Sequence, residues 1–325
     1  MIRFIDLFCG IGGFRFGLDI AARKNGIPTE CVFSSDIDSA CQTAYEANFG
    51  ERPTGDITAI DASAVPNHDL LLGGFPCQPF SIMGDRKGFN DTRGTLFFHI
   101  AKILAEKKPR AFVLENVKTL VGHNQGHTFK RIYETLRELG YTVDYRVLNA
   151  LNYGLPQKRE RVWIVGRLGE HEPFAWPKQD IPMKPLTEIL EKSVPRSLVA
   201  SPRIQKLRMA SMKGIKVPTP SIWHENKAGH ISAYPYSCAL RAGASYNYLL
   251  VDGKRRMSAR ELLRLQGFPD TFKLAVSDAQ TRKQAGNSLP VNVATCILNS
   301  LLNAFPSPPN GRKIQTPVSA ESVSC

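Results

Sequence analysis

Residues 2–14 read IRFIDLFCGIGGF, and this stretch decides the fold. Its first seven residues are apolar apart from two charged ones, which predicts a short buried strand. A glycine-rich turn follows, and the apolar residues after it are spaced for one face of a helix. Residues 31–35 predict a second strand, which ends at Asp36. Strand, glycine turn, helix, strand and acid in this order predict a βαβ unit.

The turn and the acid of this unit are suited to a nucleotide. Gly10, Gly12 and Gly13 would let a ligand approach the backbone, and the helix N-terminus offers unpaired N–H groups. Asp36 is placed to accept both hydroxyls of a ribose. A solvated acid at a strand end is the alternative interpretation of Asp36.

Alternating strands and helices continue along the first half of the chain. Further strands are predicted at 68–72, 111–114, 141–148 and 162–165, and helices at 39–49, 96–106 and 129–139. This alternation predicts an α/β fold with a doubly wound, mostly parallel sheet.

Residues 73–81, GGFPCQPFS, follow the third predicted strand and place Cys77 on a turn at its carboxyl end. Pro76 fixes its own φ and stiffens the approach to that turn. A buried structural cysteine is the alternative, but Pro-Cys-Gln-Pro is typical of turns. A thiolate held there would be a nucleophile. The polar, glycine-containing residues 82–94 predict either a lid or a plain surface loop.

Two further groups of charged residues adjoin apolar strands. Glu115 follows residues 111–114 directly, so burial would favour its protonated form, and a helix cap is the alternative role. Residues 157–161, QKRER, precede the strand at 162–165. Their guanidinium groups would either point at a carbonyl or phosphate of a substrate or form a solvated loop face.

Composition restricts the class of partner. The chain has 325 residues and a net charge of +13, which favours a polyanionic partner, although solubility alone is the plainer explanation. No apolar run is long enough to span a bilayer and the N-terminus lacks a signal peptide, so we expect a cytosolic protein. The seven cysteines include no CxxC pair and no histidine at metal spacing, so we expect no metal site.

Several blocks, in their order along the chain, resemble the DNA (cytosine-5) methyltransferases, in particular the short bacterial restriction–modification type. The resemblance reaches to about Phe305. The matching blocks are residues 4–14, 73–81, 115–117, 157–161, 260–270 and 286–288. Asp36 departs from the usual glutamate of the family, and Ala239-Leu240 departs from the usual Thr-Leu pair.

This resemblance implies S-adenosylmethionine as cofactor and double-stranded DNA as partner. It also implies a mechanism in which a cytosine is flipped out of the duplex and Cys77 adds to its carbon-6. Glu115 would hold ring nitrogen 3, and Arg161, with Arg159, would contact the ring oxygen. We expect a monomer, with a cognate restriction endonuclease that shares the target site but need not bind.

The resemblance assigns roles to individual residues. The catalytic residues it implies are Cys77, Glu115, Arg159 and Arg161. The cofactor-binding residues it implies are Phe8, Gly10, Gly12, Gly13, Asp36, Ile37, Asp56, Ile57, Pro76, Leu96, Asn287 and Ser288. The DNA-binding residues it implies are Gln78, Ser81, Met83, Arg93 and Arg241.

The chain is expected to form two domains, because its composition becomes rich in Pro, Lys and Ser after Pro173. Residues 1–175 and 284–305 would form the cofactor-binding catalytic domain, in which 284–290 is a turn and 291–302 a helix. Residues 176–258 would form a smaller, irregular, β-rich target-recognition domain, and 259–283 a hinge. Residues 306–325 would be a disordered tail.

Three other functions remain possible from the sequence. Methylation of tRNA is the alternative within the family. A nucleotide-dependent oxidoreductase would use the same glycine turn but would leave Cys77, Glu115 and Arg161 without a joint role. A catalytically silent DNA-binding module would have no need for the thiol.

Overall fold

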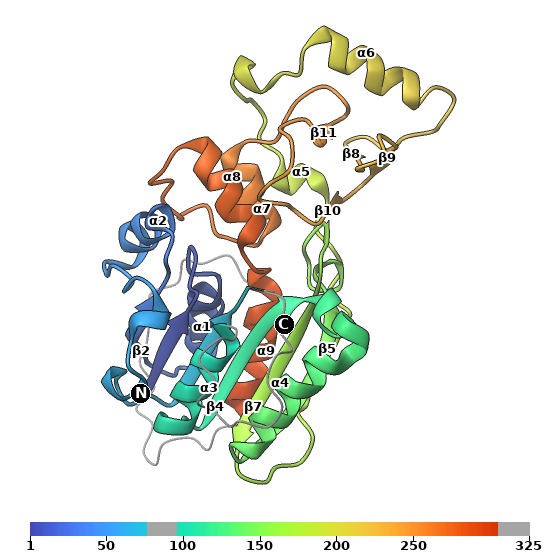
Figure 1. Ribbon diagram of the computed structural model, residues 1–325. Helices are drawn as coiled ribbons and strands as arrows, with labels where there is room; N and C mark the ends of the chain where they lie inside the picture. The colour runs from blue at the N-terminus through green and yellow to red at the C-terminus, as the bar shows by residue number, and fades with distance from the viewer. Residues whose placement is uncertain (77–95, 305–325) are drawn as a thin grey trace. The chain divides into compact units, whose positions relative to one another are not determined.

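The computed structural model describes residues 1–76 and 96–304. The described chain divides into two compact units (Figure 1). Unit 1 is made of Met1–Leu148 without residues 77–95, Glu160–Pro177, and residues 294–304. Unit 2 is made of Asn149–Arg159 and Lys178–Val293.

Unit 1 contains a six-stranded sheet with the order β2-β1-β3-β4-β7-β5. Its strands are β1 (Ile2–Leu7), β2 (Thr29–Ser35), β3 (Leu70–Gly74), β4 (Ala111–Val117), β5 (Tyr141–Asn149) and β7 (Glu160–Leu168). The pairs β1–β2, β1–β3 and β3–β4 are parallel, and β4–β7 is antiparallel. The carboxyl ends of β1 to β4 therefore lie at one edge of the sheet, which is where ligands bind in open α/β sheets.

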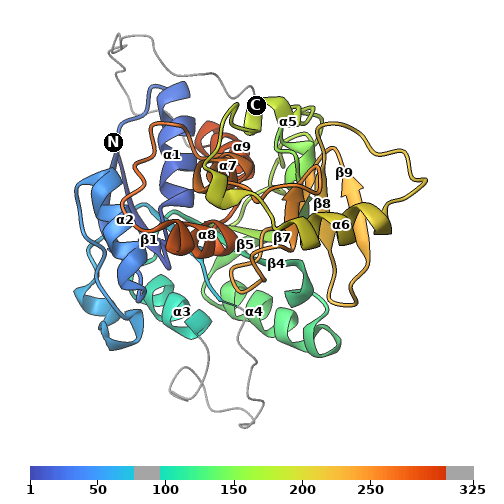
Figure 2. The same ribbon diagram turned by 90° about the horizontal axis from the view of Figure 1, so that it is seen from above.

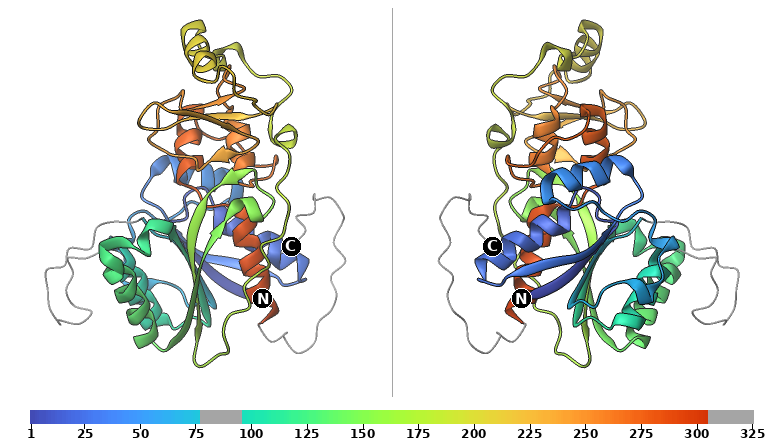
Figure 3. Two further views of the ribbon diagram at one scale, coloured as in Figure 1. Left: turned by 90° about the vertical axis from the view of Figure 1, so that its right-hand side faces the viewer. Right: turned by 90° about the vertical axis from the view of Figure 1, so that its left-hand side faces the viewer.

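Helices cover both faces of this sheet. They are α1 (Gly13–Lys24), α2 (Ser39–Phe49), α3 (Leu96–Lys107), α4 (His127–Glu138) and α9 (Val291–Asn303). Figure 3 shows α3 and α4 on one face and α1 and α9 on the other. The apolar faces of α3 and α4 join side chains of β1, β3 and β4 in one core cluster. Burial on both faces explains why these strands read as continuous apolar runs.

Short 3-10 turns connect these elements, namely η1 (Ile57–Ala59), η2 (Ala62–Ala64), η3 (Lys118–Leu120) and η4 (His123–Gly126). The prediction of a doubly wound, mostly parallel sheet is confirmed. The predicted face of α1 is also confirmed, since Phe14, Leu18, Ala21 and Ala22 are buried.

Unit 2 is smaller and irregular. It contains a three-stranded antiparallel sheet of β8 (Ile222–Glu225), β9 (Ile231–Tyr234) and β11 (Leu249–Val251), and a two-residue parallel pair of β6 (Gln157–Lys158) and β10 (Ser237–Cys238). Its helices are α5 (Leu186–Ile189), α6 (Pro202–Ser211), α7 (Ala259–Leu265) and α8 (Asp278–Asn287), with 3-10 turns η5 (Ala150–Asn152) and η6 (Arg196–Leu198). Figure 2 looks down on α6, β8 and β9 of this unit.

Two local features of unit 2 concern the ends of its helices. Helix α7 begins at Ala259 because Ser258 caps it and forms a reciprocal capping box with Glu261. The predicted turn at 284–290 is wrong at its start, because α8 continues to Asn287. Gly286 lies inside that helix. Its position requires glycine because an added Cβ would meet the backbone of Ala242 at 2.4 Å.

Candidate active site

The turn after β1 is tightly held and open on one side. Phe8, Gly10 and Gly12 all have positive φ, at 54°, 55° and 84°. The N–H of Cys9 donates to the carbonyl of Ser35 at 3.0 Å, which ties the turn to the end of β2. A Cβ on Gly12 would lie 2.2 Å from the Phe49 ring, whereas a Cβ on Gly10 would meet nothing within 4 Å. The backbone at Gly10 is therefore open to a ligand.

Asp36 lies beside this opening. Its Oδ2 accepts from the N–H of Gly10 at 2.8 Å, and its Oδ1 accepts from the N–H of Asp38 at 2.9 Å. Each carboxylate oxygen has further lone pairs, so Asp36 can still accept hydroxyl donors. The neighbouring Ile37 is 74% exposed, and its apolar side chain offers a surface for a flat ring.

Asp56 and Ile57 follow at the next turn, where Asp56 caps η1. The Oδ1 of Asp56 accepts from the N–H of Thr58 at 2.9 Å. Hydrogen bonds from Thr58 hold the pKa of Asp56 below its usual value, so this exposed carboxylate is charged at neutral pH. The Ile57 side chain is buried in the core cluster, as Leu96 partly is, so Ile57 can offer a ligand its backbone only.

The open glycine turn, the acceptor at Asp36 and the exposed Ile37 form a site of the right chemistry for a nucleoside. An open backbone with N–H donors and an acidic side chain at the second strand is the arrangement that holds ribose in βαβ units. The residues present therefore fit a cofactor that carries a nucleoside.

Glu115 and Arg161 form an ion pair at the same edge of the sheet. The Nε of Arg161 lies 2.9 Å from Oε1 of Glu115, and their side chains are 13% and 11% exposed. The register explains the contact: Glu115 pairs with Trp163, so Arg161 is its diagonal neighbour across β4 and β7. The alternative role of Glu115 as a helix cap is wrong, because it lies within β4.

Asn116 connects this pair to the strand that leads to the cysteine. Gly74, at the end of β3, pairs with Glu115. The side-chain amide of Asn116, which is 2% exposed, donates to the carbonyl of Phe75 at 2.8 Å. This bond fixes the backbone directly before the exposed Pro76, and the next residue in the sequence is Cys77. The role of Asn116 was not assigned from the sequence, since an amide partner 41 residues away leaves no local signal.

Five of the residues with assigned roles lie outside the described residues. They are Cys77, Gln78, Ser81, Met83 and Arg93. The predicted lid at 82–94 and the predicted tail at 306–325 lie outside them as well.

Arg159 has a different environment from Arg161. It belongs to unit 2, is 1% exposed, and donates to three backbone carbonyls. Its NH1 donates to Leu240 at 3.0 Å, and its NH2 to Gly286 at 3.1 Å and to Ser288 at 2.5 Å. These contacts join β6, the segment after β10 and the end of α8.

Gln157 and Gln266 extend this buried polar cluster. The Nε2 of Gln157 donates to the carbonyl of Leu265 at 2.8 Å, and its Oε1 accepts from the N–H of Leu240 at 3.0 Å. Gln266 donates to the carbonyl of Ala285 at 2.5 Å. Asn287 and Ser288, the two residues of this unit to which the resemblance gives a cofactor-binding role, follow Gly286 directly in the sequence. The side chain of Asn287 is exposed.

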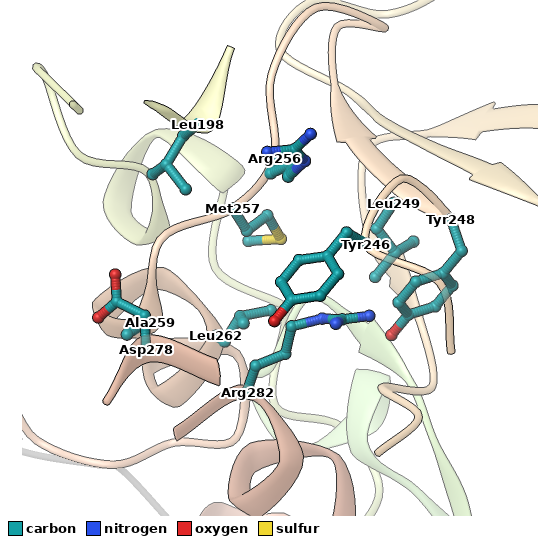
Figure 4. A pocket seen from close by; sticks show the side chains of 10 residues that line it. All are labelled: Leu198, Tyr246, Tyr248, Leu249, Arg256, Met257, Ala259, Leu262, Asp278 and Arg282. Atoms are coloured by element: carbon teal, nitrogen blue, oxygen red, sulfur yellow. The ribbon is translucent and has the colours of Figure 1, made fainter. Parts of the chain in front are cut away.

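The loop 241–248 contains Arg241 and is held from several sides. The N–H of Arg241 donates to the Tyr248 hydroxyl at 3.0 Å, and its guanidinium lies 4.6 Å from the centre of the Tyr248 ring. The guanidinium of Arg282, from α8, lies 4.2 Å from the centre of the Tyr246 ring, and both residues line a pocket of about 60 Å³. Figure 4 shows the two side chains lying along one another. Tyr246 is 55% exposed, so the loop presents an aromatic side chain outward. The contact between Tyr246 and Arg282 leaves no local signal in the sequence, because the two residues are 36 positions apart.

Two observations on other classes of site complete the description. Within residues 1–76 and 96–304, no group of three or more His, Cys, Asp or Glu side chains is placed to hold a metal ion. None of the helices in those residues is long and apolar enough to cross a membrane.

The fold and the site together define a Rossmann-like methyltransferase class. A model of the C-5 cytosine-specific DNA methylase family matches residues 2–303, and the chain belongs to this family. Membership implies a methyl-donor cofactor and a DNA substrate.

Individual relatives agree with this assignment. The chain is 54% identical to the Type II methyltransferase M.NgoBI of Neisseria gonorrhoeae over 314 residues, which are 95% of this chain and 96% of that protein. It is 53% identical to the Type II methyltransferase M.HaeII of Haemophilus aegyptius over 303 residues, which are 93% of each chain. The crystal structure of S. pombe Dnmt2 methyltransferase shares the fold, with a TM-score of 0.70 and 22% identity over 93% of this chain and 99% of that one.

Proposed function

We propose that this protein transfers a methyl group from S-adenosylmethionine to carbon-5 of a cytosine within a specific sequence of double-stranded DNA. The Glu115–Arg161 ion pair carries the proposal, because it places a carboxylate and a guanidinium beside the strand that ends three residues before Cys77. Such a pair suits a pyrimidine ring, whose nitrogen 3 and oxygen 2 are neighbouring atoms.

The cofactor would be held by unit 1 at the carboxyl edge of its sheet. Asp36 would accept the ribose hydroxyls, Ile37 would pack on the adenine, and Gly10 would let the ligand approach the backbone. Asp56 and Ile57 would contact the adenine edge, and Phe8, Gly12, Gly13, Pro76 and Leu96 would complete the site. Asn287 and Ser288, to which the resemblance also gives this role, would contact the cofactor as well. S-adenosylmethionine would supply an electrophilic methyl group.

The protein groups would activate a carbon that is otherwise a poor nucleophile. The Cys77 thiolate adds to carbon-6 of a flipped cytosine, and electron density moves onto carbon-5 and the ring. Glu115 holds nitrogen 3 through a proton, and Arg161 stabilises charge on oxygen 2. Once carbon-5 carries the methyl group, a base removes its proton and the thiolate leaves, which restores the double bond and the free enzyme.

Arg159 would act as a positioning residue in this scheme. Its guanidinium donates to three backbone carbonyls of unit 2 at a position that is 1% exposed. We therefore assign the contact with the ring oxygen to Arg161 and the ordering of unit 2 to Arg159.

Unit 2 would hold most of the DNA-reading surface, with Arg241 on the loop 241–248. The remaining DNA contacts, Gln78, Ser81, Met83 and Arg93, would come from the segment around Cys77.

We further propose the division expected from the sequence: residues 1–175 and 284–305 for catalysis, 176–258 for target recognition, and 259–283 as a hinge. The enzyme would work as a monomer in the bacterial cytosol, as the modification partner of a restriction endonuclease.

The test uses tritiated S-adenosylmethionine and duplex DNA. We expect methyl transfer to DNA by the natural protein, none by Cys77→Ser, and a stable covalent adduct with DNA that contains 5-fluorocytosine, since fluorine at carbon-5 blocks elimination. Transfer that persists in Cys77→Ser would refute the nucleophile. Preferential methylation of tRNA in a competition with duplex DNA would establish the alternative within the family.

A second test addresses the cofactor site. We expect Asp36→Ala to weaken binding of S-adenosylmethionine about tenfold to a hundredfold in calorimetry, because it removes a charged acceptor of two hydroxyls. Tight binding of a nicotinamide nucleotide, with no binding of S-adenosylmethionine, would instead establish an oxidoreductase.

A further inference from the structure

One part of unit 2 concentrates the positive charge of the protein. Residues 192–224, which we call the basic segment, contain seven Lys and Arg residues and no Asp or Glu. The whole chain has 29 acidic residues among 325, so a stretch of this length would contain about three at the average frequency. The charge of the basic segment is therefore more than half the size of the net charge of +13.

The structure leaves most of these cations in solvent. The exposed ones are Lys192, Arg196, Arg203, Lys206, Lys213 and Lys216. Within the described part of the chain, none of these six forms an ion pair with a carboxylate, so their charge is not neutralised locally. Ordinary solvated faces mix both signs of charge, and a field of one sign is the pattern that attracts a polyanion.

The seventh cation anchors the segment to the rest of unit 2. Arg208 is 7% exposed and is the buried residue of α6. Its NH2 forms an ion pair with Glu225 of β8 and donates to the carbonyl of Asn247 at 2.9 Å. In Figures 1 and 3, α6 lies at the end of unit 2 that is remote from α8. A helix that is pinned by one buried arginine presents its exposed cations, Arg203 and Lys206, in a fixed place, and Lys213 and Lys216 follow the helix directly in the chain.

We propose that the basic segment binds phosphates of the DNA duplex outside the base pairs that are read for sequence. The inference rests on the proposed function, which supplies a duplex as partner, and it goes beyond that function by assigning a second, sequence-independent contact surface. Lysines are suited to it because an ammonium group is a compact charge on a flexible stem, which neutralises a phosphate without fixed geometry. Arg208 also holds the loop 241–248 through the carbonyl of Asn247. Phosphate binding by the basic segment would therefore keep this loop near a groove of the DNA.

The test measures the salt dependence of binding. The probe is a fluorescein-labelled duplex of about 30 base pairs and arbitrary sequence, followed by anisotropy between about 50 and 200 mM KCl. The variant carries Lys206→Gln, Lys213→Gln and Lys216→Gln. The matched control carries Lys108→Gln, Lys130→Gln and Lys178→Gln, three exposed lysines outside the basic segment, and so changes the net charge equally.

Each phosphate contact contributes about 0.9 to the slope of log K against log salt, so we expect the variant to lose about 2 to 3 from that slope. Its affinity at low salt should fall at least tenfold, while its rate of methyl transfer at saturating DNA stays within about twofold of the natural protein. The control should keep the natural slope, and the three lysines replaced by arginine should restore it.

Equal slopes for the variant and the control would overturn the proposal. So would a loss of binding with an unchanged slope, because that pattern indicates damage to uncharged contacts. These outcomes are separate from failure of the proposed function, which would appear as absence of methyl transfer by the natural protein itself.

Discussion

The interior of unit 1 is mainly apolar, whereas polar side chains occupy several of the most buried positions of unit 2. In unit 1, one apolar cluster joins β1, β3 and β4 to α3 and α4. In unit 2, Gln157, Arg159, Glu261 and Gln266 are each no more than 1% exposed. A unit with a small core gains its order from hydrogen bonds that have specific partners, and each such bond is costly to leave unmade.

The same difference separates two arginines that lie two residues apart in the sequence. Arg161 is held by the carboxylate of Glu115 and the carbonyl of Glu160 and stays 13% exposed, so it can meet a substrate. Arg159 is held by three carbonyls and is enclosed. The comparison implies that polar substitutions at the edge of unit 1 should affect the reaction, and that polar substitutions inside unit 2 should affect stability.

The largest effect is expected at Glu115. Glu115→Gln keeps the shape and can still accept from Arg161, but it removes the proton and charge offered to nitrogen 3. We expect the rate of methyl transfer in a single turnover to fall about 10³-fold, within the usual range for a general acid or base. The melting temperature should change by no more than a few degrees. An unchanged rate would show that the Glu115–Arg161 pair at the edge of unit 1 has a structural role only. The polar residues of the two units would then not differ in function.

The next effect is expected at Arg159. Arg159→Leu leaves the carbonyls of Leu240 and Gly286 without the Arg159 donor, and leaves the carbonyl of Ser288 with only the 3.3 Å hydrogen bond from Gln266, so we expect the free energy of unfolding to fall by about 4 kcal/mol. The matched control is Lys158→Leu, because Lys158 is its exposed neighbour and should change stability by less than about 0.5 kcal/mol. Thermal melting compares the two. A variant at 159 that melts like the natural protein but loses activity would assign Arg159 to the chemistry instead.

The sequence predicted unit 1 in some detail because its signals are local. Apolar runs, glycine turns and helical spacing placed β1, α1, β2, α2 and α3 within a few residues of their observed bounds. The strand β4 is longer than the run at 111–114, since Glu115, Asn116 and Val117 continue the pairing with β7. Polar residues can extend a strand when the next strand pairs with them, and periodicity does not detect this.

Unit 2 was less predictable because its contacts join distant parts of the chain. Gln157 and Gln266 are 109 residues apart, and each side chain alone reads as an ordinary polar residue. The glycine at 286 predicted a turn, whereas it lies in α8 at a close approach to Ala242. The resemblance to a family named Arg159 and Arg161 together, and their different environments follow from partners that no local pattern contains.

A smaller effect is expected at Gln266. Gln266→Leu removes the donor to the carbonyl of Ala285 and leaves that buried group unpaired, so we expect a loss of about 2 kcal/mol in stability. Gln280→Leu on α8 is the control, because its side chain is exposed. Equal melting temperatures for the two variants would mean that the buried polar cluster contributes little, and that unit 2 depends on its apolar contacts as unit 1 does.

Asp6 is a carboxyl group buried inside unit 1, and the smallest effect, counted per pH unit, is expected there. Burial raises the pKa of Asp6 to about 8, although Arg15 opposes this, so the folded state binds a proton that the unfolded chain releases near pH 4. Stability should therefore fall as pH rises from about 4 to about 8, by less than about 1.4 kcal/mol per pH unit, and level off above. Asp6→Asn cannot titrate, so its melting temperature should fall less than that of the natural protein between pH 5 and 8. Asp180→Asn, at an exposed position, should follow the natural curve. Parallel curves for Asp6→Asn and the natural protein would show that Asp6 keeps its charge inside unit 1, with Arg15 compensating for its burial.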